Sequence, residues 1–286
     1  MRSTNEEFGR ALKWHLEPFY RPTDEPWFVP VEVHEYDDHQ HDHDHDHDHH
    51  RAHDEEVVLD ADEGPLYRYE RGLSPQFTGP IAGALSWALW DMHALVPKLS
   101  RDFLFLHAGA VARDEGALLL PAAMDTGKST LTAALLTQGF DYLSDELGPV
   151  DPITGQIFAF PKRISLDATS LELFPGVEER LEDRVGLSAS LRERYARPED
   201  FGARIGGPVP ARWIVFPTPD REGAPRLTPL SSAEAVELMA RNLFNLSVYR
   251  ERGAILLARV AREARAFRLD GGSSADRARL LGESLT

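Results

Sequence analysis

The sequence predicts an α/β fold built around one mixed sheet, and three observations predict it. Two apolar runs of strand length, at 103–112 and 116–121, are separated by the turn-forming residues Arg-Asp-Glu-Gly. A Gly-Lys-Ser loop follows them directly and opens a segment with helical spacing, after which another strand pattern begins. Strand-like and helix-like segments then alternate as far as the C-terminus, and this order favours a single mixed α/β core.

The first 75 residues predict a small region apart from this core. Residues 37–53 alternate histidine with aspartate over most of their length and contain no apolar residue except Ala52. Such a tract cannot bury enough surface to offset the entropy lost on ordering, so we expect a disordered insertion. Residues 57–72 hold short β-prone runs broken by Asp-Glu-Gly-Pro, which predicts a hairpin. We therefore expect a small N-terminal region at 1–75 and the main domain at 76–286.

The main domain begins with a helix, because apolar residues recur at helical spacing over 80–98. The runs at 103–112 and 116–121 are expected as strands that lead into the Gly-Lys-Ser loop. The helix that this loop opens should stop at Gly139, since glycine favours helix termination. Residues 140–146 then predict a strand that ends in two acids.

The C-terminal half continues the alternation. Ser231 lies three residues before Glu234, which predicts a capping box for a helix over 233–249. The stretch 177–207 is highly charged and predicts no clear element. The remaining expected elements are strands at 156–160, 212–217 and 264–270 and a terminal helix at 274–285.

Composition narrows the range of functions. The absence of cysteine removes disulfides, thiolate nucleophiles and Cys-ligated metal sites, and it fits a reducing cytoplasm. The net charge is −16, but residues 35–56 hold ten acids and one arginine, a contribution of −9 that leaves −7 for the rest. A chain with this balance is a poor candidate for binding nucleic acid, which requires lysine and arginine against phosphates. No secretory signal or membrane-spanning run is present in the sequence, so we expect a cytoplasmic protein without a membrane partner.

Residues 122–129 read AAMDTGKS and match the phosphate-loop pattern G-x-x-x-x-G-K-[ST] everywhere except at Ala122. Backbone N–H groups at the start of the following helix would hold the phosphate oxygens of ATP. Lys128 would reach the β- and γ-phosphates as an exposed ligand group, and the Ser129 hydroxyl would take one Mg²⁺ position. The expected nucleotide-binding residues are Asp125, Thr126, Gly127, Lys128, Ser129 and Thr130.

Two residues of this loop count against phosphate binding. Asp125 puts a carboxylate into an anion-binding loop, and Ala122 adopts positive φ less readily than glycine. The short Thr-Gly-Lys-Ser string also occurs as a simple capped helix start. The strands before it, the helix after it and the acids Asp145 and Glu146 at the end of the next strand favour nucleotide binding.

One known family shares the pattern of residues 106–151, which read LHAGAVARDEGALLLPAAMDTGKSTLTAALLTQGFDYLSDELGPVD. This segment resembles the C-terminal catalytic domain of HPr kinase/phosphorylase and its divergent relatives, distant kin of ATP-dependent phosphoenolpyruvate carboxykinase. The shared features are His107 on a strand about twenty residues before the Gly-Lys-Ser, the hairpin, the loop and helix, and the pair of acids. A weaker similarity covers roughly residues 100–285.

This chain also departs from the family pattern. The family usually has glycine where Ala122 and Asp125 stand, and commonly aspartate where Glu146 stands. The stretch specific to true HPr kinases is not recognisable. Regulation of the sugar phosphotransferase system is therefore not implied.

The resemblance implies a mixed-sheet P-loop core of the HPr kinase and phosphoenolpyruvate carboxykinase type. It also implies transfer of the γ-phosphoryl group of ATP to a serine-type hydroxyl of a peptide, a protein or a small molecule, and it is compatible with a homo-oligomer. In such chemistry Asp145 would hold Mg²⁺, Glu146 would accept the proton of the attacking hydroxyl, and His107 would orient or charge-stabilise the transferred group. The two acids could exchange roles, because adjacent residues at a strand end point in different directions. The sequence does not identify the acceptor.

Several alternatives stay open at the level of sequence. His107 could simply be a core histidine at a strand end. Lys162 and Arg163 could neutralise phosphate charge, but we favour their interpretation as an exposed basic pair without a function. The chain could be a nucleotide-binding switch or accessory protein without transfer activity. It could also be a metal-binding accessory protein in which the His/Asp tract chelates Zn²⁺, Ni²⁺ or Cu²⁺.

Overall fold

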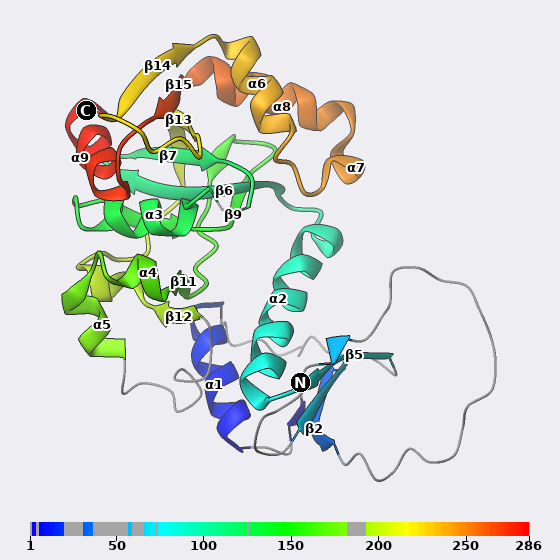
Figure 1. Ribbon diagram of the computed structural model, residues 1–286. Coiled ribbons are helices and arrows are strands. Elements are labelled where there is room, and N and C mark those ends of the chain that lie inside the picture. The colour runs from blue at the N-terminus through cyan, green and yellow to red at the C-terminus, as the bar shows by residue number, and fades with distance from the viewer. Residues whose placement is uncertain are drawn as a thin grey trace. The chain divides into compact units, whose positions relative to one another are not determined.

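The computed structural model describes residues 2–3, 6–19, 31–36, 57–58, 66–71, 74–124, 126–181 and 193–285 (Figure 1). The chain forms two compact units, the first from Met1–Ala94 with Glu182–Arg192 and the second from Leu95–Leu181 with Glu193–Thr286. The expected division at residue 75 differs from this one because most of the helix after it belongs to the first unit. The His/Asp tract at 37–53 lies outside the described residues. In the described part, no helix is both long and apolar enough to cross a membrane.

The first unit contains a five-stranded sheet in the order β1-β2-β4-β5-β3. Strands β2, β4 and β5 are antiparallel neighbours, whereas β1 and β3 pair in parallel with the outer strands β2 and β5. The hairpin expected over 57–72 is therefore wrong, because both edges of β4 are taken by β2 and β5, and β3 pairs with β5 instead. The bounds of these elements are β1 Arg2–Ser3, α1 Glu6–Leu16, η1 Glu17–Phe19, β2 Val31–Tyr36, β3 Val57–Val58, β4 Leu66–Arg71, β5 Ser74–Gly79 and α2 Ile81–Leu99.

Helix α2 confirms the helix expected over 80–98 and packs closely on this sheet. Phe77 of β5 is fully buried, and a Cβ atom added at Gly83 would come within 2.4 Å of its ring. The missing side chain therefore allows the helix to approach the ring. Tyr69 of β4 donates a hydrogen bond of 2.8 Å to the buried carboxylate of Asp91 on α2.

The second unit is built on a large mixed sheet, as the sequence predicts. Its strands follow the order β10-β9-β6-β7-β13-β15-β14, with β8 also on β6 and β10 also on β13. β13 runs parallel to both β7 and β15, and the other pairs are antiparallel. The strands are β6 Leu104–Arg113, β7 Gly116–Pro121, β8 Asp141–Ser144, β9 Leu147–Val150, β10 Gln156–Ile157, β13 Val209–Pro217, β14 Arg226–Leu230 and β15 Arg265–Asp270, and a separate pair joins β11 Ile164–Asp167 to β12 Glu193–Ala196.

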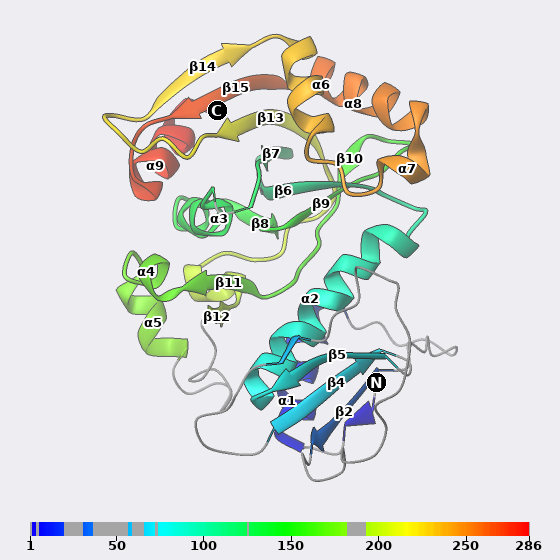
Figure 2. The same ribbon diagram turned by 45° about the vertical axis from the view of Figure 1, so that its right-hand side comes forward.

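Helices cover both faces of this sheet. Successive side chains along a strand point to opposite faces, so the strands contribute residues to two apolar cores. Val111 and Leu118 belong to the core under α3 and α9, whereas Ala110 and Leu119 belong to the core under α6 and α8. Figure 2 shows α3 on one side of the sheet and α6 with α8 on the other. The helices of this unit are α3 Lys128–Leu136, α4 Ala168–Leu171, α5 Pro175–Leu181, η4 Pro198–Phe201, α6 Ser232–Ala240, α7 Leu246–Tyr249, α8 Glu251–Glu263 and α9 Ser274–Ser284.

Local signals in the sequence are confirmed where they set a backbone conformation. The hairpin of β6 and β7 turns at Asp114 and Glu115, both with positive φ, and Gly139 after α3 has φ 84°. The capping box of Ser231 and Glu234 is present, with the Ser231 Oγ accepting from the Glu234 N–H at 3.3 Å.

The helix expected over 233–249 ends early, and the strand expected over 156–160 is shorter than predicted. Residues 242–245 leave the helix because they bond to β6 instead. The N–H of His107 donates to the Asn242 carbonyl at 2.7 Å, and the N–H of Phe105 donates to the Asn245 side chain at 2.9 Å. A contact of this kind between distant segments has no signature in the helical pattern.

Candidate functional site

The candidate site lies around His107 and Ala108 in the middle of β6, where three segments of the second unit meet. Ala108 is paired with Pro121, the last residue of β7, and its N–H donates to the Glu146 carbonyl at 3.0 Å. His107, one residue earlier, accepts a hydrogen bond of 3.3 Å from the N–H of Ala122, where the loop begins. Neighbouring strands lie about 4.8 Å apart, so the strand that leads into the loop and the strands that flank the acid turn lie roughly 10 Å apart across β6. The register thus brings together the loop, His107 and the acids that the sequence singled out.

The loop from Ala122 to Gly127 turns the chain from β7 into α3. Gly127 is the N-cap residue with φ 81° and ψ 29°, a left-handed conformation that glycine adopts without strain. The first N–H groups of a helix have no partners within it, so those at the start of α3 are donors for an anion. Asp125 lies outside the described residues.

Ala122 stands where related loops have glycine, but its backbone does not have the positive φ that would strain an alanine. Among the described residues other than glycine, positive φ occurs at Asp114, Glu115 and Arg250, and Ala122 is not one of them. The alanine side chain is buried. Glycine is therefore not needed at this position for backbone conformation.

Lys128 is buried at the start of α3, although the sequence predicts an exposed ligand group. Its ammonium donates a hydrogen bond of 2.6 Å to the carbonyl of Ala123, and the hydroxyl of Thr126 donates to the same carbonyl at 2.9 Å. The lysine therefore folds back over its own loop. A phosphate bound here would have to draw the ammonium away from a backbone carbonyl, or share it.

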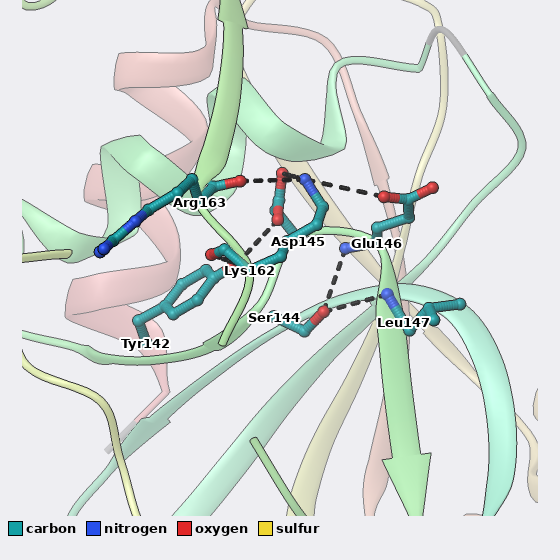
Figure 3. Close-up of polar contacts among 7 residues, drawn as sticks. All are labelled: Tyr142, Ser144, Asp145, Glu146, Leu147, Lys162 and Arg163. Carbon is teal, nitrogen blue, oxygen red and sulfur yellow. Dashed lines mark hydrogen bonds and ion pairs between the residues drawn. The ribbon is translucent and has the colours of Figure 1, made fainter. Parts of the chain in front are cut away.

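The acid pair follows β8 in a turn held by Ser144 (Figure 3). The Ser144 hydroxyl oxygen accepts from the N–H groups of Glu146 at 3.1 Å and Leu147 at 3.0 Å. These bonds fix the backbone between β8 and β9. Asp145 and Glu146 consequently occupy defined but different positions.

Asp145 is enclosed by two hydrogen-bond donors. The Tyr142 hydroxyl donates to its Oδ1 at 2.7 Å, and the Lys162 ammonium lies 3.0 Å from its Oδ2 (Figure 3). The Asp145 side chain is 1% exposed and that of Glu146 is 35% exposed. Glu146 Oε2 lies 3.6 Å from the same ammonium. Only Glu146 of the two therefore has substantial access to solvent.

Electrostatic interactions in this cluster keep the proton on both Lys162 and Tyr142. Burial by itself would lower the pKa of Lys162, but the carboxylates of Asp145 and Glu146 outweigh it and raise that pKa. Burial, reinforced by the charge of Asp145, raises the pKa of Tyr142 well above its usual value. Lys162 thus stays protonated and Tyr142 stays a donor. The interpretation of Lys162 and Arg163 as an exposed basic pair is wrong, since both are buried.

His107 lies within β6 rather than at its end, and its ring lies 5.1 Å from that of Phe244. Burial, together with the positive charge of Lys128, lowers the pKa of His107 to about 4. The imidazole is therefore neutral at pH 7. It can accept or donate a hydrogen bond there, but it carries no charge with which to stabilise a phosphoryl group.

The residues expected to hold Mg²⁺ differ in how accessible their oxygen atoms are to the ion. Oxygen donors suit Mg²⁺, and the Ser129 hydroxyl and the Glu146 carboxylate are of that kind. Asp145 is less accessible to Mg²⁺ than Glu146, because its side chain is buried and each of its oxygens already accepts a hydrogen bond, from Tyr142 or from Lys162. Thr130 contacts Ser170, with 2.7 Å between their hydroxyl oxygens. Within the described ranges no cluster of three or more His, Asp or Glu side chains could hold a metal by itself.

Several residues of the site were missed by sequence reasoning. Tyr142 and Ser144 lie in a strand pattern that gives no sign of their hydrogen bonds to the acid turn. Arg221, whose Nη2 donates to the Thr126 carbonyl at 2.9 Å, lies 95 residues away in the chain from its partner. Only the three-dimensional arrangement brings these groups to the loop.

No model of a known protein family matches this chain, and no curated protein matches it. A function therefore has to be inferred from the mixed α/β fold and from the site itself.

Proposed function

We propose that this protein is an ATP-dependent kinase that transfers the γ-phosphoryl group to a serine-type hydroxyl. One observation carries the proposal: the pairing of β6 places the Gly-Lys-Ser loop and the acid turn on opposite sides of His107. A helix start whose first N–H groups suit phosphate, and a solvent-accessible carboxylate on the other side of one strand, suit phosphoryl transfer. The resemblance to HPr kinase/phosphorylase supports the same activity and suggests a P-loop core of that type.

The phosphates would bind at the start of α3. Its first N–H groups would cradle the phosphate oxygens, and the Lys128 ammonium would leave the Ala123 carbonyl for the β- and γ-phosphates. Ser129, at the start of α3, is the oxygen donor that would hold Mg²⁺ directly or through water. That ion, when bound, would neutralise charge on the β- and γ-phosphates.

Glu146 is the better candidate for the general base. Its carboxylate is accessible, whereas Asp145 is held by Lys162 and Tyr142. We therefore assign Asp145 a positioning role: it fixes the Lys162 ammonium, which in turn lies 3.6 Å from Glu146. The sequence prediction that Asp145 holds Mg²⁺ stays a prediction, and it requires the ion to reach a buried carboxylate.

The proposed step conserves atoms and charge. The acceptor oxygen forms a bond to the γ-phosphorus while the bond between that phosphorus and the β–γ bridging oxygen breaks. The electron pair of the broken bond stays with ADP, and the proton of the acceptor hydroxyl passes to the Glu146 carboxylate. His107, neutral at pH 7, would orient the acceptor or the phosphoryl group by a hydrogen bond.

A second candidate function is nucleotide binding without transfer. The observation that favours it is the burial of Asp145, whose two carboxylate oxygens accept hydrogen bonds from Tyr142 and Lys162. A protein that had lost transfer activity would need Lys128 and the α3 start but no accessible acid. The accessibility of Glu146 favours the kinase.

The test uses MgATP-dependent thermal stabilisation together with transfer from γ-labelled ATP to serine-containing peptides. Stabilisation at a hundredfold excess over Kd should reach about 2.7 kcal/mol in the wild type. Lys128→Met keeps much of the buried side chain but removes the ammonium, so it should abolish this gain, whereas Lys98→Met, an exposed control, should not. Equal stabilisation of both variants would refute the loop assignment. Binding without transfer to any hydroxyl would favour the second candidate.

A further inference from the structure

Arg221 lies in the segment between β13 and β14 and packs directly on the phosphate loop. Its Nη2 donates to the Thr126 carbonyl at 2.9 Å. A Cβ atom added at Gly127 would come within 2.5 Å of the same nitrogen. The guanidinium therefore occupies the space that a side chain at Gly127 would need.

The segment that carries Arg221 is held in place by hydrogen bonds from Arg277 of α9. This arginine is fully buried, and its Nε and Nη1 donate to the carbonyls of Gly271 at 2.6 Å and Thr218 at 3.0 Å. Its Nη2 donates to the carbonyl of Asp220, the residue before Arg221. The backbone next to Arg221 is thus fixed by hydrogen bonds, and this fixed backbone positions the Arg221 guanidinium beside the loop.

The positive charges of Arg221 and Arg277 act on each other. Burial and the neighbouring charge of Arg221 together lower the pKa of Arg277 to about 10, although the carboxylates of Asp270 and Asp220 act in the opposite direction. Arg277 still carries its charge at pH 7. An anion beside Arg221 would be attracted by its positive charge, and this attraction is independent of the Gly-Lys-Ser pattern.

We propose that Arg221 is a phosphate-binding residue, which contacts the polyphosphate chain of a nucleoside triphosphate held in loop 122–129. The inference rests on the proposed nucleotide site and adds a binding residue to it. A guanidinium has five N–H donors. Arg221 uses one on the Thr126 carbonyl and one in a long contact of 3.5 Å with the Ser274 hydroxyl. The remaining donors match phosphate oxygens in the bidentate geometry that arginine favours.

The test measures the affinity of the full-length protein for MgATP and for magnesium tripolyphosphate by titration calorimetry. Arg221→Ala should weaken both ligands by roughly 10- to 100-fold, the loss expected for a hydrogen bond to a charged group. Arg221→Lys should recover part of this affinity, because it keeps the charge but loses the planar fork. Arg226→Ala removes one exposed positive charge on nearby β14 and should leave both affinities unchanged.

Three results would overturn the inference in distinguishable ways. If Lys128→Met loses MgATP binding and Arg221→Ala does not, the phosphate site stands and the role of Arg221 falls. If Arg221→Ala weakens MgATP but not tripolyphosphate, the guanidinium contacts the nucleoside instead of the phosphates. If the wild-type protein binds neither ligand, the proposed function and the inference fall together.

Discussion

Asp145 and Glu146 are adjacent in the chain but have different surroundings, and this difference decides what each can do. A carboxylate whose two oxygens bond to Tyr142 and Lys162 gains little from approaching a substrate, because it would have to give up a buried ion pair. Glu146 interacts with the same ammonium at a longer distance and retains contact with water. The accessible acid is therefore the one that can take up a proton.

The substitution Glu146→Gln tests this assignment. Glutamine keeps the size and reach of the side chain but cannot accept the hydroxyl proton as a carboxylate does. Nucleotide affinity should survive, while single-turnover transfer should fall by roughly 10²- to 10⁴-fold. Measured by γ-labelled transfer, an unchanged rate would remove Glu146 from the mechanism.

Asp145→Asn is the matched comparison, because it makes the same chemical change one residue away. It leaves the Lys162 ammonium beside a neutral amide in a buried position, so loss of stability should dominate, about 3 kcal/mol or more. A variant that melts like the wild type but has lost Mg²⁺-dependent binding would restore Asp145 as a metal ligand.

At this scale the sequence predicts residues whose roles follow from local pattern. Lys128 and Gly127 are recognisable because a phosphate loop needs both within a few positions of each other. The burial of Lys162, the hydroxyl of Tyr142 and the approach of Arg221 depend on long-range packing, for which the sequence carries no local signal.

Strand β6 organises the site at the level of elements. It pairs with β7, which leads into the loop, and with β8 and β9, which flank the acid turn. Its N-terminal part also bonds to residues 242–245 after α6. One strand thus sets the spacing among the loop, the acids and His107.

The turn from the loop into α3 gives a prediction with an internal control. Gly127 and Gly139 flank α3 with nearly the same φ, 81° and 84°. An added Cβ meets Arg221 at Gly127 and nothing within 4 Å at Gly139. Each alanine substitution should cost about 1–2 kcal/mol of stability for the left-handed backbone, but only Gly127→Ala should also abolish MgATP-dependent stabilisation.

Thermal melting with and without MgATP measures both effects. If the two variants respond equally to MgATP, the surroundings of Gly127 do not matter for binding. The phosphate site would then have to lie elsewhere than at the start of α3.

Elements were predictable where a short apolar run and a turn signal coincide. The hairpin of β6 and β7 is of this kind, and so is the turn at Gly139 that follows α3. The partner of β3 was not, because two valines do not specify which edge of a sheet they join. The end of α6 at Ala240 was missed for a similar reason, since the competing bonds come from β6.

On the scale of the whole molecule, the two compact units have separate apolar cores in their described residues. Both core clusters under the large sheet consist of residues from the second unit alone. The first unit buries its own set, including Phe8, Tyr69 and Phe77. Every residue placed in the proposed site also belongs to the second unit.

A chain beginning at Ser100, after α2, should therefore fold and bind nucleotide by itself. Residues 182–192, which belong to the first unit, stay in this chain so that the second unit remains continuous. We expect one cooperative melting transition and a MgATP-dependent gain equal to that of the full-length protein, because neither core loses a residue. The same truncation carrying Lys128→Met should melt cooperatively without that gain. If instead the truncated chain folds but does not respond to MgATP, while the full-length protein does, then residues before Ser100 contribute to the nucleotide site, and a site built from the second unit alone is wrong.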